Sequence, residues 1–267
     1  METTLKYARL LSAFFRYSLT REMMFKTNFI LWIIVDFLWF GAQIVFIQVL
    51  FYQTPEVAGW DKNQMIMLFG TNHLIQQLFS CLFMTNCIQI PELIRTGKLD
   101  FQLVLPVNTQ FLVSTRNFDP GALVNSSIGL AFVVYAAINL RIHPSLLQYA
   151  MYVVLVVSGI FLHYALLMLI VTLSFWIIRA QGLVYGYYNL FQIARIPSQA
   201  FKGVIWYLFT FALPMLVVAN FPARVMAFPF SASDLGMLWA LGLTAFFVWM
   251  ASRFWSFALK HYTSASS

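Results

Sequence analysis

The stretch RTGKLDFQLVLPV, residues 95–107, is a long charged interruption between apolar segments of the chain. Of the 267 residues, 61% are hydrophobic and only 9% are charged. A soluble globular domain carries roughly 25% charged residues, so this composition is typical of a chain that lies in lipid. Because backbone polar groups in lipid must be paired within the chain, long apolar runs of this kind predict an all-α membrane protein.

Six charge-poor stretches around residues 95–107 are long enough to cross a bilayer, which takes about 20 residues. They lie at 29–51, 64–90, 120–140, 146–178, 203–221 and about 236–257. The sequence therefore predicts six transmembrane helices within a domain that covers residues 27–260. The division leaves a cytoplasmic loop at 91–118, a short extracytoplasmic loop at 222–234 and a cytoplasmic tail at 261–267.

The distribution of lysine and arginine predicts the orientation of these spans. Six crossings place both termini on one side, which collects 13 basic residues, whereas the other side collects three. The larger set is Lys6, Arg9, Arg16, Arg21, Lys26, Arg95, Lys98, Arg116, Arg179, Arg195, Lys202, Arg253 and Lys260; the smaller set is Lys62, Arg141 and Arg224. Since basic residues concentrate in cytoplasmic connections, both termini are expected in the cytoplasm. The charges flank apolar segments and form no basic run, so they do not indicate nucleic-acid binding.

Residues 1–26 carry too many charges to span, and they are predicted to form an amphipathic helix on the inner membrane surface. Apolar residues recur among the basic ones at a spacing of three to four. These apolar positions are Leu5, Ala8, Leu11, Phe15 and Leu19. A plain basic tail that only sets the topology is the alternative.

Two segments near the fifth predicted span are interrupted by glycine and proline. Residues 180–201 are apolar but broken, which predicts an interfacial lead-in to the span at 203–221. The segment 219–234 contains two prolines and is expected on the outer side, partly re-entrant. Such irregular backbone at membrane depth is tolerated only against protein or water.

The start of the 91–118 loop, PELIRTG, predicts a short capped helix. Pro91 suits a first helical position, and Glu92 favours the positive start of a helix. Arg95 favours the helix end, and Gly97 is typical of the stop that follows it. A short rigid helix between two long spans moves when the spans move, which suits a mechanical contact. A capped turn that only reverses the chain is the alternative.

Polar side chains inside the predicted spans are candidates for a translocation path or a dimer seam. Asp36 is an acid deep in the first span, where an isolated charge costs at least about 2.5–3.5 kcal/mol. The second span carries a broad polar face that has to avoid lipid. The candidate residues are Asp36, Thr71, Asn72, His73, Gln76 and Ser80. Interhelix hydrogen bonding and packing are the alternative for all of them.

Four fragments in order along the chain carry a family resemblance: RTGKLDFQLVLPV, FLVSTRNFD at 111–119, SFWIIRA at 174–180 and NFPA at 220–223. With its six predicted spans, the chain resembles over essentially its whole length a bacterial permease family of the ABC type-2 exporter class. The resemblance implies a permease of the bacterial inner membrane that works with two ATPase subunits and a second permease, identical or related. It also implies a substrate that is lipid-like, a glycan or amphipathic.

By the same resemblance, PELIRTG corresponds to the coupling helix of the class, and residues 1–26 correspond to its interface helix. The residues implied in coupling to the ATPase are Pro91, Glu92, Leu93, Ile94, Arg95, Thr96, Gly97, Lys98 and Asp100.

The sequence contains no G-x-x-x-x-G-K-[ST] motif, so it has no phosphate-binding loop of that kind. An exporter built on this chain needs its ATPase in trans. The chain is therefore expected to be non-catalytic and to bind no cofactor, with ATP and Mg²⁺ on the partner ATPase. Cys81 and Cys87 lie in an apolar run, and no His/Cys spacing predicts a metal site.

Two other functions stay open at the level of sequence. One is an ion- or proton-coupled carrier that uses Asp36 and His73. The other is an intramembrane enzyme with His73 or His163 as its base, although no Gly-x-Ser-x-Gly or HExxH motif occurs.

Overall fold

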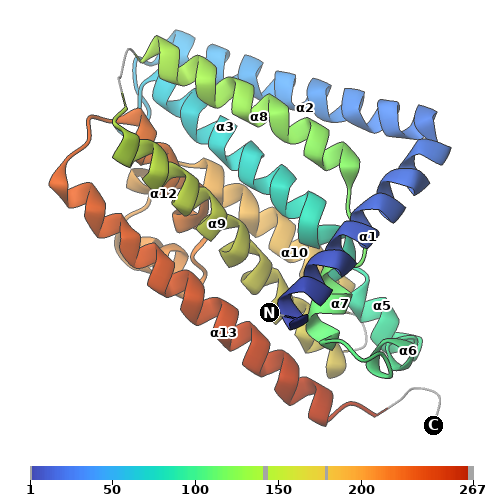
Figure 1. The fold of residues 1–267 in the computed structure, drawn as a ribbon. Helices are drawn as coiled ribbons and strands as arrows, with labels where there is room; N and C mark the ends of the chain where they lie inside the picture. The colour runs from blue at the N-terminus through green and yellow to red at the C-terminus, as the bar shows by residue number, and fades with distance from the viewer. Residues whose placement is uncertain (1, 141–143, 178–179, 264–267) are drawn as a thin grey trace.

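The computed structural model describes residues 2–140, 144–177 and 180–263, and the regular structure of this part of the chain is helical. Within the described residues, the only β contact is an isolated bridge between Val57 and Trp60. The predicted all-α class is therefore confirmed. Figure 1 shows the long helices side by side in one bundle, with several short helices gathered at one end.

Four helices are long and apolar enough to cross a membrane, and they coincide with four of the predicted spans. They are α2 (Lys26–Gln53), α8 (Pro120–Asn139), α9 (Leu146–Thr172, continued by η2 at Leu173–Phe175) and α13 (Trp239–Lys260, preceded by η6 at Ala232–Leu238). Asp119 caps α8 by accepting a hydrogen bond from the backbone of Ala122. Ser145 caps α9 by accepting one from the backbone of Gln148. These caps satisfy backbone donors that a helix start leaves unpaired.

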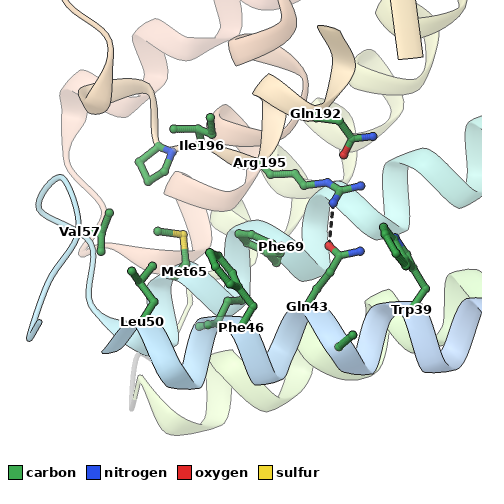
Figure 2. A pocket seen from close by; sticks show the side chains of 13 residues that line it. Trp39, Gln43, Phe46, Leu50, Val57, Met65, Phe69, Gln192, Arg195 and Ile196 are labelled. Carbon is green, nitrogen blue, oxygen red and sulfur yellow. Dashed lines mark hydrogen bonds between the residues drawn. The ribbon is translucent and has the colours of Figure 1, made fainter. Parts of the chain in front are cut away.

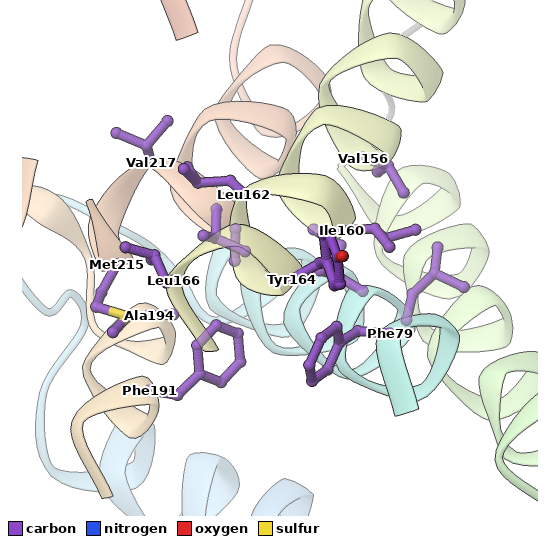
Figure 3. Close-up of a cluster of buried hydrophobic side chains, with 14 of the residues drawn as sticks. Phe79, Val156, Ile160, Leu162, Tyr164, Leu166, Phe191, Ala194, Met215 and Val217 are labelled. Atoms are coloured by element: carbon purple, nitrogen blue, oxygen red, sulfur yellow. The ribbon is translucent and has the colours of Figure 1, made fainter. Parts of the chain in front are cut away.

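The second predicted span, 64–90, is the central helix of the bundle. α3 (Lys62–Phe79) continues through the π-helix η1 (Ser80–Met84) and α4 (Thr85–Cys87). α3 is not among the helices that are apolar enough to cross a membrane by composition. It packs instead against α8, α9 and α12 (Met215–Ala227), so protein covers its polar residues. Its apolar residues join the main core, where Figure 3 shows Phe79 with Tyr164 and Phe191.

The backbones of α3 and α8 approach closely at a pair of glycines. A Cβ atom on Gly129 would lie 2.7 Å from the backbone nitrogen of Leu74 and 2.9 Å from the backbone oxygen of Gly70. A Cβ atom on Gly70 would lie 3.1 Å from the backbone oxygen of Gly129. Small residues at such a contact allow two membrane helices to pack at short distance.

The structure corrects the predicted fifth span at 203–221, because the chain bends sharply there. α11 (Gly203–Tyr207) and η5 (Leu208–Ala212) meet α12 at an angle of 90°. The break lies at Leu213 and Pro214, where the helical backbone is interrupted. A sequence window that counts apolar residues does not detect this change of direction.

Both ends of the bent segment 203–227 lie at the same end of the bundle. Trp60, in the connection between α2 and α3, donates from Nε1 to Oε1 of Gln199 at 3.0 Å. Gln64, in the first turn of α3, donates from Nε2 to the backbone oxygen of Ala227 at 3.3 Å. Residues 203–227 therefore form a hairpin that starts and finishes beside the α2–α3 connection.

The predicted interfacial segment at 180–201 instead runs along the bundle. It contains α10 (Gln181–Phe191), η3 (Gln192–Arg195) and η4 (Ser198–Ala200). α10 packs against α9 and follows η2, which contacts α5 (Ile90–Arg95) at one end of the bundle. η4 lies at the other end, where Gln199 meets Trp60. Residues 181–199 thus connect the two ends.

This path changes the positions of two charges that were assigned to the side with the termini. Lys202 follows Gln199 and lies at the end of the bundle with the α2–α3 connection. Arg195 lies within the bundle and donates from Nη1 to Gln43 Oε1 at 2.8 Å. Two other charges used for the orientation, Arg141 and Arg179, lie outside the described residues.

The predicted loop at 222–234 begins later than expected, because α12 continues to Ala227. Pro222 lies inside α12 and has no N–H group for the backbone oxygen of Val218. That oxygen faces α9, since a Cβ atom on Gly159 would lie only 2.7 Å from it. Close packing of the Gly159 backbone covers the freed carbonyl, in the manner of a weak C–H···O contact.

The N-terminal helix and three short helices gather at the end of the bundle where α13 finishes (Figure 1). They are α1 (Glu2–Met24), α5, α6 (Asp100–Leu103) and α7 (Thr109–Thr115). The N-terminal helix and the end of α13 therefore lie at the same end as the 91–118 connection.

Substituting alanine for Gly129 is expected to destabilise the protein. The new methyl group would lie 2.7 Å from the backbone of Leu74, and overpacking of this kind costs about 1–3 kcal/mol. Thermal unfolding of the purified protein in detergent measures the effect. Gly41→Ala is the matched control, because a Cβ atom on Gly41 meets nothing within 4 Å. Equal melting temperatures for the two variants would contradict the close contact.

Candidate functional site

The connection after α4 forms a short helix with the features that the sequence predicts. α5 covers Ile90–Arg95, with Pro91 in its first turn. Arg95 donates from Nε and Nη2 to the two carboxylate oxygens of Glu92, at 2.9 and 2.7 Å. These hydrogen bonds lower the pKa of Glu92 and raise that of Arg95. Both groups therefore stay charged at neutral pH, and the bidentate pair holds them on one face of the helix.

Gly97 ends this helix in a left-handed backbone conformation, with a φ of 69°. Such an angle suits glycine and turns the chain sharply after the helix. The backbone nitrogen of Leu99 then bonds to the backbone oxygen of Leu93 at 3.1 Å, which closes the turn. The predicted stop at Gly97 is confirmed.

The predicted coupling residues divide into an anchoring set and a displayed set. Pro91, Ile94 and Gly97 are buried against the body of the protein. Arg95, Thr96 and Lys98 are exposed, whereas Glu92, Leu93 and Asp100 are half-buried. α5 is thus fixed on its apolar side and presents polar groups on the other side.

An apolar patch beside α5 was missed by sequence reasoning. We call it the 101–105 patch, and it consists of Phe101, Leu103, Val104 and Leu105, all exposed. Phe101 is 77% exposed and Val104 is 80% exposed. Contiguous exposed apolar groups outside lipid are typical of contact surfaces. The run LDFQLVLPV inside an otherwise charged loop was the signal that could have revealed the patch.

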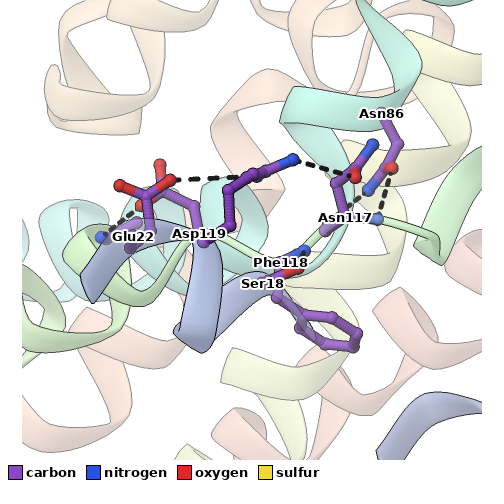
Figure 4. A network of polar contacts seen from close by, with 8 residues as sticks. Ser18, Glu22, Asn86, Asn117, Phe118 and Asp119 are labelled. Atoms are coloured by element: carbon purple, nitrogen blue, oxygen red, sulfur yellow. Dashed lines mark hydrogen bonds and ion pairs between the residues drawn. The ribbon is translucent and has the colours of Figure 1, made fainter. Parts of the chain in front are cut away.

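α1 is bound to the linker at 106–118 by contacts spread over its length. Near its start, Lys6 Nζ donates to the backbone oxygen of Pro106 at 2.8 Å, and Tyr7 packs edge-on against Phe111. Near its end, Ser18 Oγ accepts from the backbone of Phe118 at 2.9 Å. Figure 4 shows this second contact. α1, residues Glu2–Met24, is therefore packed against the linker.

The linker is also joined to the central helix by a reciprocal pair of hydrogen bonds (Figure 4). Asn86 of α4 donates from Nδ2 to the backbone oxygen of Asn117 at 2.6 Å. Its Oδ1 accepts from the backbone nitrogen of the same residue at 2.8 Å. Arg21 of α1 reaches Asn117 Oδ1 at 3.3 Å. Asn117 thus links α1 to the helix that leads into α5.

Asp36 lies in a polar cavity of about 440 Å³ between α1, α2, α3–η1 and α8. Its carboxylate accepts from Asn125 Nδ2 at 2.6 Å and from Gln77 Nε2 at 3.4 Å. The same cavity is lined by Gln76 and Ser80. It also contains three charged residues near the start of α8 and the end of α1, namely Arg21, Glu22 and Asp119.

The polar face predicted for the second span is divided by the structure. Asp36, Gln76 and Ser80 line the polar cavity together. Thr71, Asn72 and His73 do not line it and are buried inside the chain. The Thr71 hydroxyl lies 3.1 Å from the Tyr152 hydroxyl of α9, and the His73 ring packs on Phe40 of α2 at 4.2 Å.

A second cavity, about 430 Å³, lies between α2 and η3 and was not predicted (Figure 2). We call it the Arg195 groove. Arg195 extends from η3 towards Gln43 of α2, and apolar side chains surround the pair. The apolar lining includes Trp39, Phe46, Leu50, Val57, Met65 and Phe69. Sequence reasoning did not detect this groove, because it assigned Arg195 to the cytoplasmic side.

His163 is held as a packed core residue. Its ring lies 3.8 Å from the rings of both Phe79 and Phe191, and its Nδ1 is hydrogen-bonded to the Tyr187 hydroxyl. Such enclosure fits the packing role of a lone histidine. Among the described residues, no group of three or more His, Cys, Asp and Glu side chains could hold a metal ion.

Comparison with known proteins identifies the family. The model of the family described as ABC-2 family transporter protein matches residues 37–266, which is most of the chain. The chain matches no curated protein and no solved structure. The matched range includes α3, α8, α9, α13, residues 91–100 and the Arg195 groove, whereas Asp36 and the α1 residues that line the polar cavity lie before it. The chain therefore belongs to the ABC-2 transporter family and is a membrane permease with transmembrane helices.

Proposed function

We propose that this chain is the membrane-spanning permease of an ATP-driven exporter in the bacterial inner membrane. In this proposal two separate ATPase subunits bind ATP and Mg²⁺, and a second permease, identical or related, completes the translocation path. The observation that carries the proposal is α5, a capped helix anchored by Ile94 and held directly below the central helix. The family match supports a permease role for the whole unit.

The ATPase contact in this proposal combines polar and apolar groups. Charge and hydrogen bonding fix how the permease is aligned on the ATPase, through the exposed residues Arg95, Thr96 and Lys98. The adjacent 101–105 patch supplies apolar area that water would otherwise cover. A push on this surface is transmitted upward through α4 and α3, and sideways through Asn117 to α1. α1 is then the interface helix, lying along the inner membrane surface.

The proposed topology has six crossings, formed by α2, α3, α8, α9, the segment 181–199 and α13. The hairpin at 203–227 dips into the outer side without crossing. Both termini then lie in the cytoplasm. The charge pattern supports this orientation, because the helix-rich end of the bundle still carries most of the basic residues after Lys202 and Arg195 are reassigned.

The polar cavity is proposed to be the inner part of the translocation path. Asp36, Gln76 and Ser80 line it, and it opens beside the first helix and the start of α8. Thr71, Asn72 and His73 act as packing groups within this chain. A lipid-like, glycan or amphipathic substrate suits a path whose lower part is polar and whose upper part is apolar.

Cysteine labelling distinguishes the proposed topology from one in which 203–221 crosses the membrane. In a background without Cys81 and Cys87, a cysteine at position 202 is expected to react with an impermeant maleimide in intact spheroplasts. Position 224 should react in the same way, and positions 98 and 260 should react only after permeabilisation. External labelling at 98, or internal labelling at 202, would refute this arrangement.

The purified permease is expected to have no steady ATP hydrolysis, because its sequence lacks a phosphate-binding loop. Activity should appear when the ATPase encoded with it is added. A phosphate-release assay on both preparations measures this difference. Steady turnover by the permease alone, free of contaminating ATPases, would contradict the assignment of hydrolysis to a partner.

Replacement of Gly97 by valine is expected to abolish transport while leaving the membrane fold intact. A β-branched residue at a φ of 69° is strained by about 1–2 kcal/mol or more, so the turn after α5 should shift. Gly97→Asn is the matched control, because asparagine tolerates this conformation. Transport and substrate-stimulated ATPase activity are measured in proteoliposomes. Normal transport by the valine variant would argue against α5 as the coupling element.

A further inference from the structure

The Arg195 groove contains a positively charged side chain, Arg195, at membrane depth. Gln43, its hydrogen-bonding partner, lies about 25 Å along the axis of α2 from Lys26, given a rise of 1.5 Å per residue. That position is in the half of α2 nearer the α2–α3 connection. Arginine in such a place is costly unless it is paired or faces a cavity, and it commonly marks a substrate path.

The guanidinium of Arg195 has no carboxylate partner among the described residues. The ion pairs found there are Arg21–Glu22, Arg95–Glu92 and Arg224–Asp234. A guanidinium carries five N–H donors, and the acceptor recorded for it in this part of the chain is Gln43 Oε1. The groove therefore combines a fixed positive charge with donors that an anion can use.

The walls of the groove are apolar and favour an apolar part of a ligand. Trp39, Phe46 and Leu50 lie along α2, and Met65 and Phe69 face them from α3. The volume of about 430 Å³ falls in the range of about 300–1,000 Å³ that is typical of small-molecule sites. A small inorganic anion would leave these walls in contact with water. A molecule with an apolar chain would cover them.

We propose that the Arg195 groove binds a single-chain anionic amphiphile, such as a long-chain carboxylate. The head accepts two hydrogen bonds from the Arg195 guanidinium, a geometry for which the planar fork is suited. The alkyl chain lies against Trp39, Phe46 and Leu50. The inference rests on the proposed export function, because it names the class of substrate that the outer half of the path accepts.

The experiment uses quenching of Trp39 by a brominated ligand. The full-length permease is placed in nanodiscs of zwitterionic phosphatidylcholine, and 9,10-dibromostearate is titrated without ATP or ATPase. We expect saturable quenching that is lost in Trp39→Phe. The methyl ester of the same acid and a brominated alkyltrimethylammonium should give only the non-saturable quenching of a partitioned chain.

Variants separate recognition by Arg195 from a purely structural role. Arg195→Gln is expected to weaken binding of the brominated acid at least about tenfold, the loss typical of a hydrogen bond to a charged group. Lys202→Gln, which removes an exposed charge at the same end of the bundle, should bind normally. Arg195→Lys keeps the charge but lacks the planar guanidinium with its paired donors. It replaces Arg195→Gln in the comparison if the glutamine variant does not fold.

Three outcomes would overturn the proposal. Equal affinity for the acid and its methyl ester would show that the groove does not recognise the negative charge of the ligand. Unchanged affinity in folded Arg195→Gln and Arg195→Lys would show that Arg195 does not contribute to binding. If the Arg195 variants change permease dimerisation but leave quenching by the brominated acid unchanged, the groove is instead a contact between protein chains. Because the assay contains no ATPase, any of these results leaves the exporter assignment intact, and failure of ATP-dependent transport leaves the binding result intact.

Discussion

The arrangement of the helices depends on the need to keep the polar residues of α3 out of lipid. Thr71, Asn72 and His73 are buried at its middle, where neighbouring helices separate these polar side chains from lipid. α8, α9 and α12 surround the helix, and the contact at Gly70 and Gly129 brings α8 close enough to cover it. α2 has no such requirement and leaves most of its apolar side chains exposed. The helix at the centre of the bundle is also the one that leads through η1 and α4 into α5, so the core and the end of the bundle that displays α5 form one continuous structure.

Much of the fold could be predicted from the sequence, because the signals were local. The charge-poor ranges 120–140 and 146–178 correspond to α8 and α9, and Pro91 and Gly97 bracket a short helix. The error concerned the region between α9 and α13. Hydropathy measures how apolar a stretch is and carries no information about its direction, so the hairpin with Pro214 at its bend resembled a span. The glycines of α10 made a helix that runs along the bundle resemble an interfacial segment.

The candidate site was predicted only in part, because only some of its signals are local in the sequence. Asp36 was identifiable because a carboxylate in a span is unusual, and its hydrogen bonds from Asn125 and Gln77 are of the interhelix kind that was the alternative to a path role. The single polar face expected on α3 divides in two, since which residues face a cavity depends on the neighbours that pack around the helix. Arg195 was missed as a consequence of the misplaced fifth span. Once residues 180–201 had been assigned to the membrane surface, a basic residue there needed no explanation.

The π-helix at Ser80–Met84 has a consequence for which changes this chain can tolerate. A π-helical turn accommodates one residue more than a regular α-helical turn, and it frequently occurs where function constrains a helix. Deleting one residue from this turn would restore regular winding and leave the helix below it nearly in register with α3, whereas a deletion in the regular helix beside it would rotate everything below by about 100°. After such a rotation Asn86 would face away from Asn117, and α5 would present a different face. A single insertion or deletion is therefore better absorbed inside this turn than in the regular helix on either side, so changes of length among related chains should concentrate at Ser80–Met84.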